Sequence, residues 1–299
     1  MFSYANNLSV SRIDDSTKQL SANIDALVVT DPLFDYAVVN EEESSKNRKK
    51  REEIDNLWQA HNVNNAEIEM DKTAAFSITD PTISRDTARF IASCLLKHHL
   101  NAKEAVITDG SACTGGNVFE FAKFFKHVNA VEFNMSRAQM LLRNVTALKL
   151  HNVCAFDNDI TNPKLLHQTE MFKQGSVLFL DPPWGGPGYQ AIQNLNLFLG
   201  EEGSRVRLAE VCNRWSHFAQ FIALKLPRNF ALTQFLADVR GRFTLLESRD
   251  MYNDVFQMIP VFYVIILKKN PDAPQQRAAE YRTHQSRKPR FYSRFNRDW

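Results

Sequence analysis

Short apolar runs alternate with helical stretches through the middle of the 299-residue chain, and this alternation limits its fold more than any other feature. Five runs have the composition of buried strands, at 105–109, 130–132, 153–156, 177–180 and 221–227. Stretches with helical periodicity accompany them, at 83–99, 118–125, 136–149 and 230–239. Because strand–helix–strand connections are right-handed, the pattern predicts a doubly wound parallel sheet of the α/β class, closed by two strands at 243–247 and 261–268.

Acids stand at the ends of the first three of these runs. Asp109 ends the first run, Glu132 ends the second, and Asp157 and Asp159 follow the third. Ligands of open α/β sheets bind outside the carboxyl ends of the strands, so these acids are candidates for ligand contacts. The glycine-rich turn 110–117 comes directly after Asp109, and glycine lets a ligand approach the backbone closely.

These acids suggest a nucleoside cofactor. We expect Asp109 to orient the turn and the methionine part of the cofactor, Glu132 to hold the ribose, and Asp159 to accept from the adenine amine. The GxGxxG spacing of dinucleotide sites is absent, because the glycines are Gly110, Gly115 and Gly116. The pattern therefore favours S-adenosylmethionine over NAD.

The fourth run ends in a loop with the sequence DPPWGGPGY, residues 181–189. Pro182 and Pro183 have no N–H group, so their rigid backbone presents carbonyl acceptors to an amine. Asp181 adds a carboxylate, and Trp184 offers a flat face on which a base can stack. This loop is typical of methyltransferases that act on amino groups.

Four motifs in this order resemble the RNA cap guanine-N2 methyltransferases, the trimethylguanosine synthase family. They are Phe76-Ser77-Ile78-Thr79, the segment ITDGSACTGGNVFEFA at 107–122, the loop DPPWGGPGY and Leu226-Pro227-Arg228-Asn229. The resemblance covers roughly residues 68–268. It implies a Rossmann-like class I fold that depends on S-adenosylmethionine, and the cofactor-binding residues Phe76, Thr79, Asp109, Ser111, Gly115, Asn117, Glu132, Asp159 and Asp181.

The resemblance also implies the substrate and its contacts. Asp181, Pro182, Pro183 and Trp184 form the catalytic set, which holds the N2 amine of 7-methylguanosine toward the sulfonium methyl group. Trp184 stacks on the 7-methylguanine, and Arg228 with Lys225 meets the cap phosphates. Capped RNA is then the expected partner, with proteins of the capping machinery as further partners and no metal ion required.

Two alternatives remain open. The family's loop commonly begins with a small residue such as serine, whereas this loop begins with Asp181. The sequence DPPW is also the signature of N6-adenine methyltransferases, so adenine in RNA or DNA is the first alternative substrate. A non-catalytic RNA- or cap-binding subunit is the second alternative, and the set of acids at 109, 132, 159 and 181 argues against it.

The rest of the chain is less informative. Residues 1–65 are expected to form an N-terminal extension of unknown role, which includes an apolar run at 26–29 and a charged block at 41–55. Residues 66–269 form the methyltransferase domain, and residues 270–299 form a flexible basic tail that ends in RKPRFYSRFNRDW. The net charge of +2 excludes a general nucleic-acid binder.

The four cysteines are far apart and form no CxxC pair, which argues against a zinc site and favours reduced thiols. No apolar run reaches the roughly 18 residues of a membrane span. We therefore expect no membrane contact and an intracellular location, in the nucleus or the cytoplasm.

Overall fold

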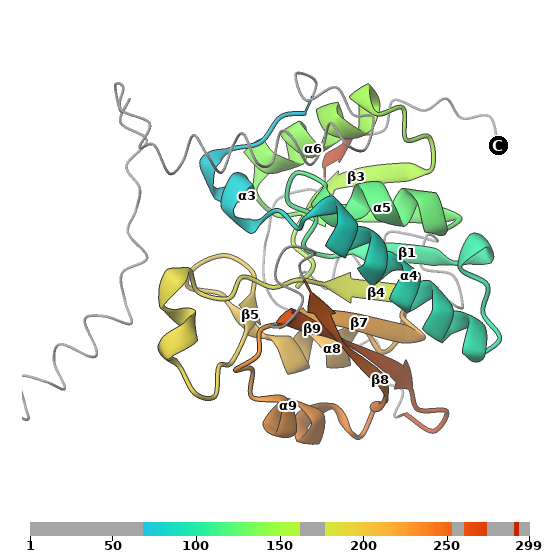
Figure 1. Cartoon of the computed structure of the whole chain (residues 1–299), viewed down its shortest axis with the longest axis vertical. Coiled ribbons are helices and arrows are strands. Elements are labelled where there is room, and N and C mark those ends of the chain that lie inside the picture. The colour runs from blue at the N-terminus through green and yellow to red at the C-terminus, as the bar shows by residue number, and fades with distance from the viewer. Residues whose placement is uncertain (1–67, 162–176, 253–259, 274–289, 293–299) are drawn as a thin grey trace, which may run out of the picture. The chain divides into compact units, whose positions relative to one another are not determined.

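The structure, a computed structural model, describes residues 68–161, 177–252, 260–273 and 290–292. Within them lies a sheet of eight strands in the order β10-β3-β2-β1-β4-β7-β9-β8 (Figure 1). The strands are β1 (Val106–Asp109), β2 (His127–Glu132), β3 (Val153–Asp157), β4 (Val177–Leu180), β7 (Phe221–Leu226), β8 (Phe243–Tyr252), β9 (Pro260–Lys269) and β10 (Arg290–Tyr292). The proposed extension, residues 1–65, with its apolar run and charged block, lies outside the described residues.

The pairing of these strands confirms the predicted α/β class and its Rossmann-like architecture. β3, β2, β1, β4 and β7 pair in parallel, and the order of the strands reverses between β1 and β4. β9 returns antiparallel to β7 and β8 pairs with β9, as expected for a closing pair. β10 pairs antiparallel with β3, so three residues of the basic tail belong to the sheet.

The helices of the described residues are α3 (Lys72–Ser77), α4 (Pro81–Lys97), α5 (Gly116–Phe124), α6 (Met135–Ala147), α8 (Leu208–Trp215) and α9 (Leu232–Val239), with short 3-10 turns η2 (Ala102–Glu104) and η3 (Pro187–Ala191). Four of the helices, α4, α5, α6 and α9, lie where the periodicity predicts, whereas α3 and α8 were not predicted. α4 begins where the sequence places a start signal: the Asp80 carboxylate accepts from the N–H groups of Thr82 and Ile83, and Pro81 occupies the first turn.

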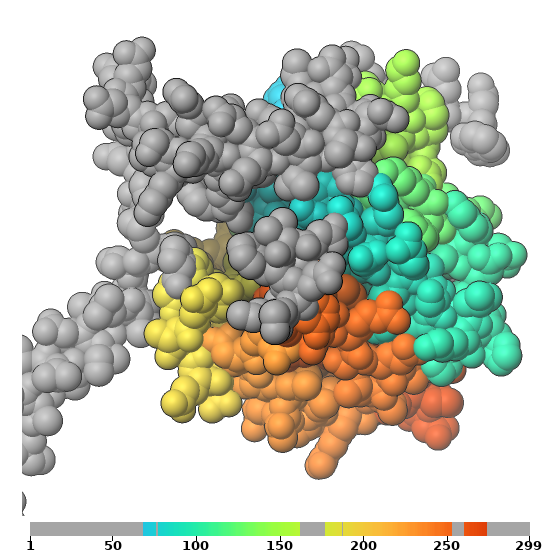
Figure 2. Space-filling model, in the orientation of Figure 1, coloured from blue at the N-terminus to red at the C-terminus, as the bar shows by residue number. Residues whose placement is uncertain are grey.

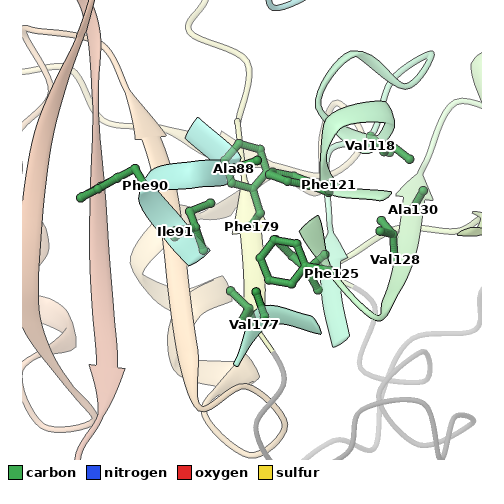
Figure 3. Packing of buried hydrophobic residues seen from close by; sticks show 14 of the residues in the cluster. Ala88, Phe90, Ile91, Val118, Phe121, Phe125, Val128, Ala130, Val177 and Phe179 are labelled. Carbon is green, nitrogen blue, oxygen red and sulfur yellow. The ribbon is translucent and has the colours of Figure 1, made fainter. Parts of the chain in front are cut away.

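Each central strand buries both of its faces, and the two faces belong to different cores. In β4, Val177 and Phe179 point into a first core cluster with α4 and α5, whereas Leu178 and Leu180 point into a second cluster with α8 and α9. Figure 3 shows the first cluster, in which Phe121 lies beside Phe179 with ring centroids 4.9 Å apart. Helices therefore cover both faces of the sheet, which leaves the ends of the strands as the place for a site.

Some elements differ from the sequence-based expectation. The helix α8 was not predicted, although its buried residues Leu208, Val211, Cys212 and Trp215 have helical spacing. The indole N–H of Trp215 donates to the carbonyl of Ile160, at 2.9 Å, which ties α8 to the segment after β3. A two-stranded sheet of β5 (Phe198–Leu199) and β6 (Val206–Arg207) was also missed, because strands of two residues carry no periodicity.

The segment 68–79, here called the strap, is held against α6 and the glycine-rich turn by polar side chains. Asn144 is fully buried and makes three hydrogen bonds: it donates to the carbonyls of Glu69 and Thr114 and accepts from the N–H of Glu69, at 2.7–2.9 Å. Arg137 pairs with Asp71 at 2.8 Å. One buried amide thus fixes the strap and the turn to the same helix.

We expect Asn144→Ala to lower the free energy of unfolding by about 1–3 kcal/mol, because the buried carbonyl of Thr114 and the partly buried backbone groups of Glu69 lose their partners. Urea denaturation measures this change. The control is Asn196→Ala, at an exposed position, which should stay within about 0.5 kcal/mol of the parent. Equal effects of the two substitutions would contradict the role of Asn144.

Candidate active site

Polar side chains gather at the edge of the sheet where β1, β2, β4 and β7 end. These strands are parallel, so their carboxyl ends meet at one edge, next to the reversal of strand order between β1 and β4. Asp109 ends β1, Glu132 ends β2, Asp181 follows β4, and Lys225 stands one residue before the end of β7. Asp109 is fully buried, and Glu132 and Lys225 are each 5% exposed.

Asp109 organises the glycine-rich turn. Its Oδ1 accepts from the backbone N–H of Ser111 at 3.0 Å and from the Ser111 hydroxyl at 3.3 Å. The Ser111 oxygen in turn accepts from the backbone N–H of Asp181 at 2.7 Å. Ser111 therefore joins the turn after β1 directly to the loop after β4.

Glu132 holds the same turn from the next strand. Its Oε2 accepts from the N–H of Cys113 and its Oε1 from the N–H of Asn134, both at 2.9 Å. Burial raises the pKa of Glu132, and these hydrogen bonds oppose that rise. Each oxygen of a carboxylate accepts more than one hydrogen bond, so the predicted contact with a ribose remains compatible with this geometry and stays a prediction.

The glycines of the turn are required by packing. A Cβ atom on Gly110 would lie 2.6 Å from side-chain carbons of Ile160 and Leu180. Gly115, the residue before α5, has a φ of 115°, and a Cβ atom there would lie 2.3 Å from the Phe119 ring. The turn is thus pressed against the core in a conformation that only glycine adopts without strain.

The rim of this turn has the chemistry that S-adenosylmethionine requires. Among the described residues, Asp109 Oδ2 is a buried acceptor without a hydrogen-bond partner. Asp159 is half-buried beyond β3, and its Oδ1 accepts from the N–H of Thr161. Phe133 directly follows Glu132 and is 46% exposed. An ammonium group, a ribose diol and an adenine ring find carboxylate acceptors and a flat apolar face here, so the residues present fit the cofactor.

The remaining predicted cofactor residues lie beside the turn. Asn117 is 7% exposed and accepts from the hydroxyl of Ser84 at 3.2 Å, which fixes α5 to α4. Thr79 is 6% exposed, and its hydroxyl accepts from Lys225 at 2.8 Å. The side chain of Phe76 is outside the described part of the structure.

Trp184 lies between the two core clusters and packs against both. Its ring meets Tyr189 and Phe262 edge-on, with centroids 5.3 and 6.2 Å apart. The indole N–H is buried and has no partner among the described residues. The side chain is half-buried, so its position is set by packing, while its predicted stacking on a base stays a prediction.

Lys225 lies inside the site. Its ammonium is 2.6 Å from Asp181 Oδ2 and 2.8 Å from the hydroxyl of Thr79. It also lies 4.6 Å from the centroid of the Phe262 ring and 5.5 Å from that of Trp184. Burial raises the pKa of Asp181, and the neighbouring ammonium lowers it in part.

Arg228 and Lys225, predicted to act together on cap phosphates, occupy different environments. The Arg228 side chain is 55% exposed, and its guanidinium lies 2.6 Å from Asp250 Oδ1, whereas the Lys225 side chain is 7% exposed. The structure therefore places Arg228 on the surface and Lys225 beneath it in the site. The phosphate contact of either residue stays a prediction.

Sequence reasoning missed the residue that holds the loop after Trp184. Asn229 donates to the carbonyls of Tyr189 at 2.7 Å and Ile192 at 2.6 Å, so it ties this loop to the end of β7. In Figure 2 the yellow surface, which includes this loop, lies against the orange surface of the later part of the chain. The signal was present, since Asn229 belongs to the segment LPRN, but its role depends on a contact across 40 residues.

No group of three or more His, Cys, Asp and Glu side chains in the described ranges is arranged to hold a metal ion. Nor does any helix in the described part of the chain have the length and hydropathy to cross a membrane.

The amino-acid sequence is similar to that of known proteins. A model of the RNA cap guanine-N2 methyltransferase family matches residues 104–271. An uncharacterized protein of Acanthamoeba polyphaga mimivirus is 36% identical over 140 residues, which cover 46% of this chain and 52% of that protein. Trimethylguanosine synthase of Saccharomyces cerevisiae is 24% identical over 173 residues, which cover 58% of this chain and 52% of that protein. The chain spans about half the length of the curated relatives it matches.

Solved methyltransferase structures are also similar. An rRNA methylase from Streptococcus thermophilus superposes with a TM-score of 0.40 at 14% identity, over 64% of this chain and 98% of that one. Magnesium protoporphyrin IX methyltransferase from Synechocystis superposes with a TM-score of 0.40 at 9% identity, over 63% and 81% of the two chains.

The burial of Asp109 predicts a pH dependence of stability. Desolvation raises the pKa of Asp109 to about 7, from 3.8. As pH rises through that window, the unfolded chain loses its proton first, so the folded state is penalised and stability falls, by on the order of a few kcal/mol. Asp109→Asn cannot ionise and should escape this loss.

We therefore expect the stability of Asp109→Asn relative to the parent to rise between about pH 4 and 7 and then to level off. Urea denaturation of the cofactor-free protein at several pH values measures it. Asp272→Asn, at an exposed position, is the matched control, and its stability should change with pH as that of the parent does. If the free energy of unfolding of Asp109→Asn followed the same pH dependence as that of the parent, the raised pKa of Asp109 would be contradicted.

Proposed function

Because the chain belongs to the RNA cap guanine-N2 methyltransferase family, we propose that it methylates the exocyclic N2 amine of 7-methylguanosine in an RNA 5′ cap. Its cofactor is S-adenosylmethionine, in keeping with the family and the fold. One observation carries the proposal further than the family match. The loop expected to hold the amine is hydrogen-bonded, from Asp181 N–H to Ser111 Oγ, to the turn expected to hold the methyl donor.

That hydrogen bond supports a shared site for donor and acceptor. S-adenosylmethionine, when bound, supplies an electrophilic methyl group on a sulfonium. The chain's own residues would hold the amine: the Asp181 carboxylate and the carbonyls of Pro182 and Pro183 accept its N–H groups. The N2 lone pair would take up this methyl group as the donor's bond to it breaks, and the amine would then release a proton. Orientation of the amine supplies most of the acceleration, so no strong base is required.

The base and phosphates of the cap would be bound by side chains next to this loop. Trp184 would stack on 7-methylguanine, whose positive charge favours an indole face. The edge-on contacts with Tyr189 and Phe262 support this role, because they hold the ring in one orientation. Arg228, exposed at the end of β7, would contact the phosphates, and Lys225 is the second residue predicted there. Capped RNA would be the substrate, and capping-machinery proteins are proposed as partners.

A second candidate is N6-adenine methylation of RNA or DNA, which Asp181 favours because an acid begins the loop of that class. The sequence Gly185-Gly186-Pro187, with Tyr189 after it, favours the cap substrate. A non-catalytic cap-binding subunit is disfavoured by the acids at the strand ends, Asp109 and Glu132 among them, which a protein without methyl transfer has no need to bury.

Methyl transfer from labelled S-adenosylmethionine to a panel of acceptors tests the function. The panel contains 7-methyl-GTP, GTP, a capped RNA, and uncapped RNA and DNA with adenine. We expect transfer to 7-methyl-GTP and to capped RNA and none to GTP. Transfer only to adenine would replace the proposal with the N6-adenine reading, and cofactor binding without any transfer would favour a non-catalytic subunit.

We further expect Trp184→Ala to lower kcat/KM for 7-methyl-GTP by about 10- to 100-fold, because a stacked base contributes roughly 1–3 kcal/mol. Affinity for S-adenosylmethionine, measured by calorimetry, should change little. Trp184→Phe keeps an aromatic face and should retain much of the activity, and circular dichroism checks that each variant is folded. Loss of cofactor binding, or full activity of Trp184→Ala, would contradict the stacking role.

A further inference from the structure

The ammonium of Lys225 is buried, which a contact with the cap phosphates does not by itself explain. It is enclosed by three segments that are distant in the sequence: Thr79 of the strap, Asp181 of the loop after β4, and Phe262 of β9. The residue is 5% exposed. Lysine is almost never buried to this extent unless its charge is paired, and here the partner is Asp181.

The pair leaves the two oxygens of Asp181 in different states. Oδ2 lies 2.6 Å from the ammonium. Oδ1 accepts no hydrogen bond from any residue in the described part of the chain, and it is not among the fully buried atoms without a partner. The backbone N–H of Asp181 is fixed to Ser111, so the residue is held at both its main chain and one oxygen.

We propose that Lys225 is a positioning residue, which fixes the Asp181 carboxylate by one oxygen so that the other, Oδ1, accepts a hydrogen bond from the amine that is methylated. The inference rests on the proposed function, because it specifies how the acceptor amine is recognised. Oδ1 of a carboxylate only accepts, so it selects an amino group and disfavours a keto oxygen at the same point. Removal of either partner would leave the other charge buried and unpaired, which would strongly lower the stability of the protein.

The surroundings of Asp181 make the role testable by pH. The charged groups that face Asp181 are Lys225 from β7 and Asp109 from β1. Ser111 is its uncharged neighbour, and Thr79 accepts a hydrogen bond from Lys225. Burial raises the pKa of Asp181 and Lys225 lowers it. Without Lys225 the pKa rises further, and a protonated Asp181 is a hydrogen-bond donor where an acceptor is needed. Without Lys225, the acid limb of the pH–activity profile must therefore move to higher pH.

The first measurement is the pH profile of kcat/KM for 7-methyl-GTP in the parent, Lys225→Met, Lys225→Arg and Asp181→Asn. We expect Lys225→Met to lose at least tenfold in kcat and to shift its acid limb upward by about one pH unit or more. Lys225→Arg keeps the charge, so its acid limb should lie where that of the parent does. Asp181→Asn has no carboxylate to protonate and should show no acid limb. Lys268→Met is the matched control, because Lys268 also lies over an aromatic ring, 5.9 Å from the Phe221 centroid, in the same sheet.

Two results would overturn the inference. A uniform loss in Lys225→Met without movement of the acid limb would mean that Lys225 is only structural. A rise in KM for 7-methyl-GTP with an unchanged kcat, absent for 7-methylguanosine without phosphates, would assign Lys225 to the phosphates instead.

A second measurement needs no methyl acceptor, so failure of the proposed function and failure of this inference are distinguishable. In Lys225→Met the melting temperature should fall as pH rises, because the unpaired Asp181 is tolerated only while it is protonated. The double variant Asp181→Asn with Lys225→Met should lose this dependence. If the single and the double variant showed the same pH dependence of the melting temperature, the ion pair with Lys225 would not be what holds Asp181. If the parent methylates adenine and not 7-methyl-GTP, the proposed substrate fails, while the same limb shift on adenine would support Lys225.

Discussion

The site exists because β1, β2, β4 and β7 run parallel and are buried on both faces. Parallel pairing brings the carboxyl ends of all four strands to one edge, and helices cover both faces of the sheet. That edge is where ligands of such sheets bind. Alternate residues of β4 belong to opposite cores, so a shift of one residue would exchange the two sets. The apolar register of the sheet therefore fixes where Asp109 and Asp181 stand.

Charged groups at this edge are buried, and each one has at least one partner that offsets part of the lost hydration. Glu132 accepts two backbone N–H groups, and Asp109 accepts from Ser111. Lys225 and Asp181 neutralise one another. A buried ion pair contributes little net stability, but loss of either partner is costly, which makes such a pair suited to hold a geometry. Preorganisation of this kind is what orientation-driven methyl transfer requires.

Single polar side chains from distant parts of the chain fasten the segments that carry the site. Asn144 of α6 holds the strap and the glycine-rich turn, and Asn229 holds the loop after Trp184. Buried backbone groups in loops need such partners because no ladder supplies them. Lys225 then joins the strap to the loop through Thr79 and Asp181, so the segments around the site are linked to one another.

The sequence by itself determined the strand and helix alternation, the acids at the strand ends and the family motifs, because these are local patterns of period, turn chemistry and spacing. Strands β4 and β9 and helix α4 were predicted close to their observed bounds for that reason. Only the tertiary structure decided that Lys225 faces Asp181 while Arg228 points to the surface, that Asn229 holds a loop 40 residues away, and that Trp184 packs between two cores. Such contacts depend on which strands become neighbours, and no local pattern encodes the direction of one long side chain at the end of a strand.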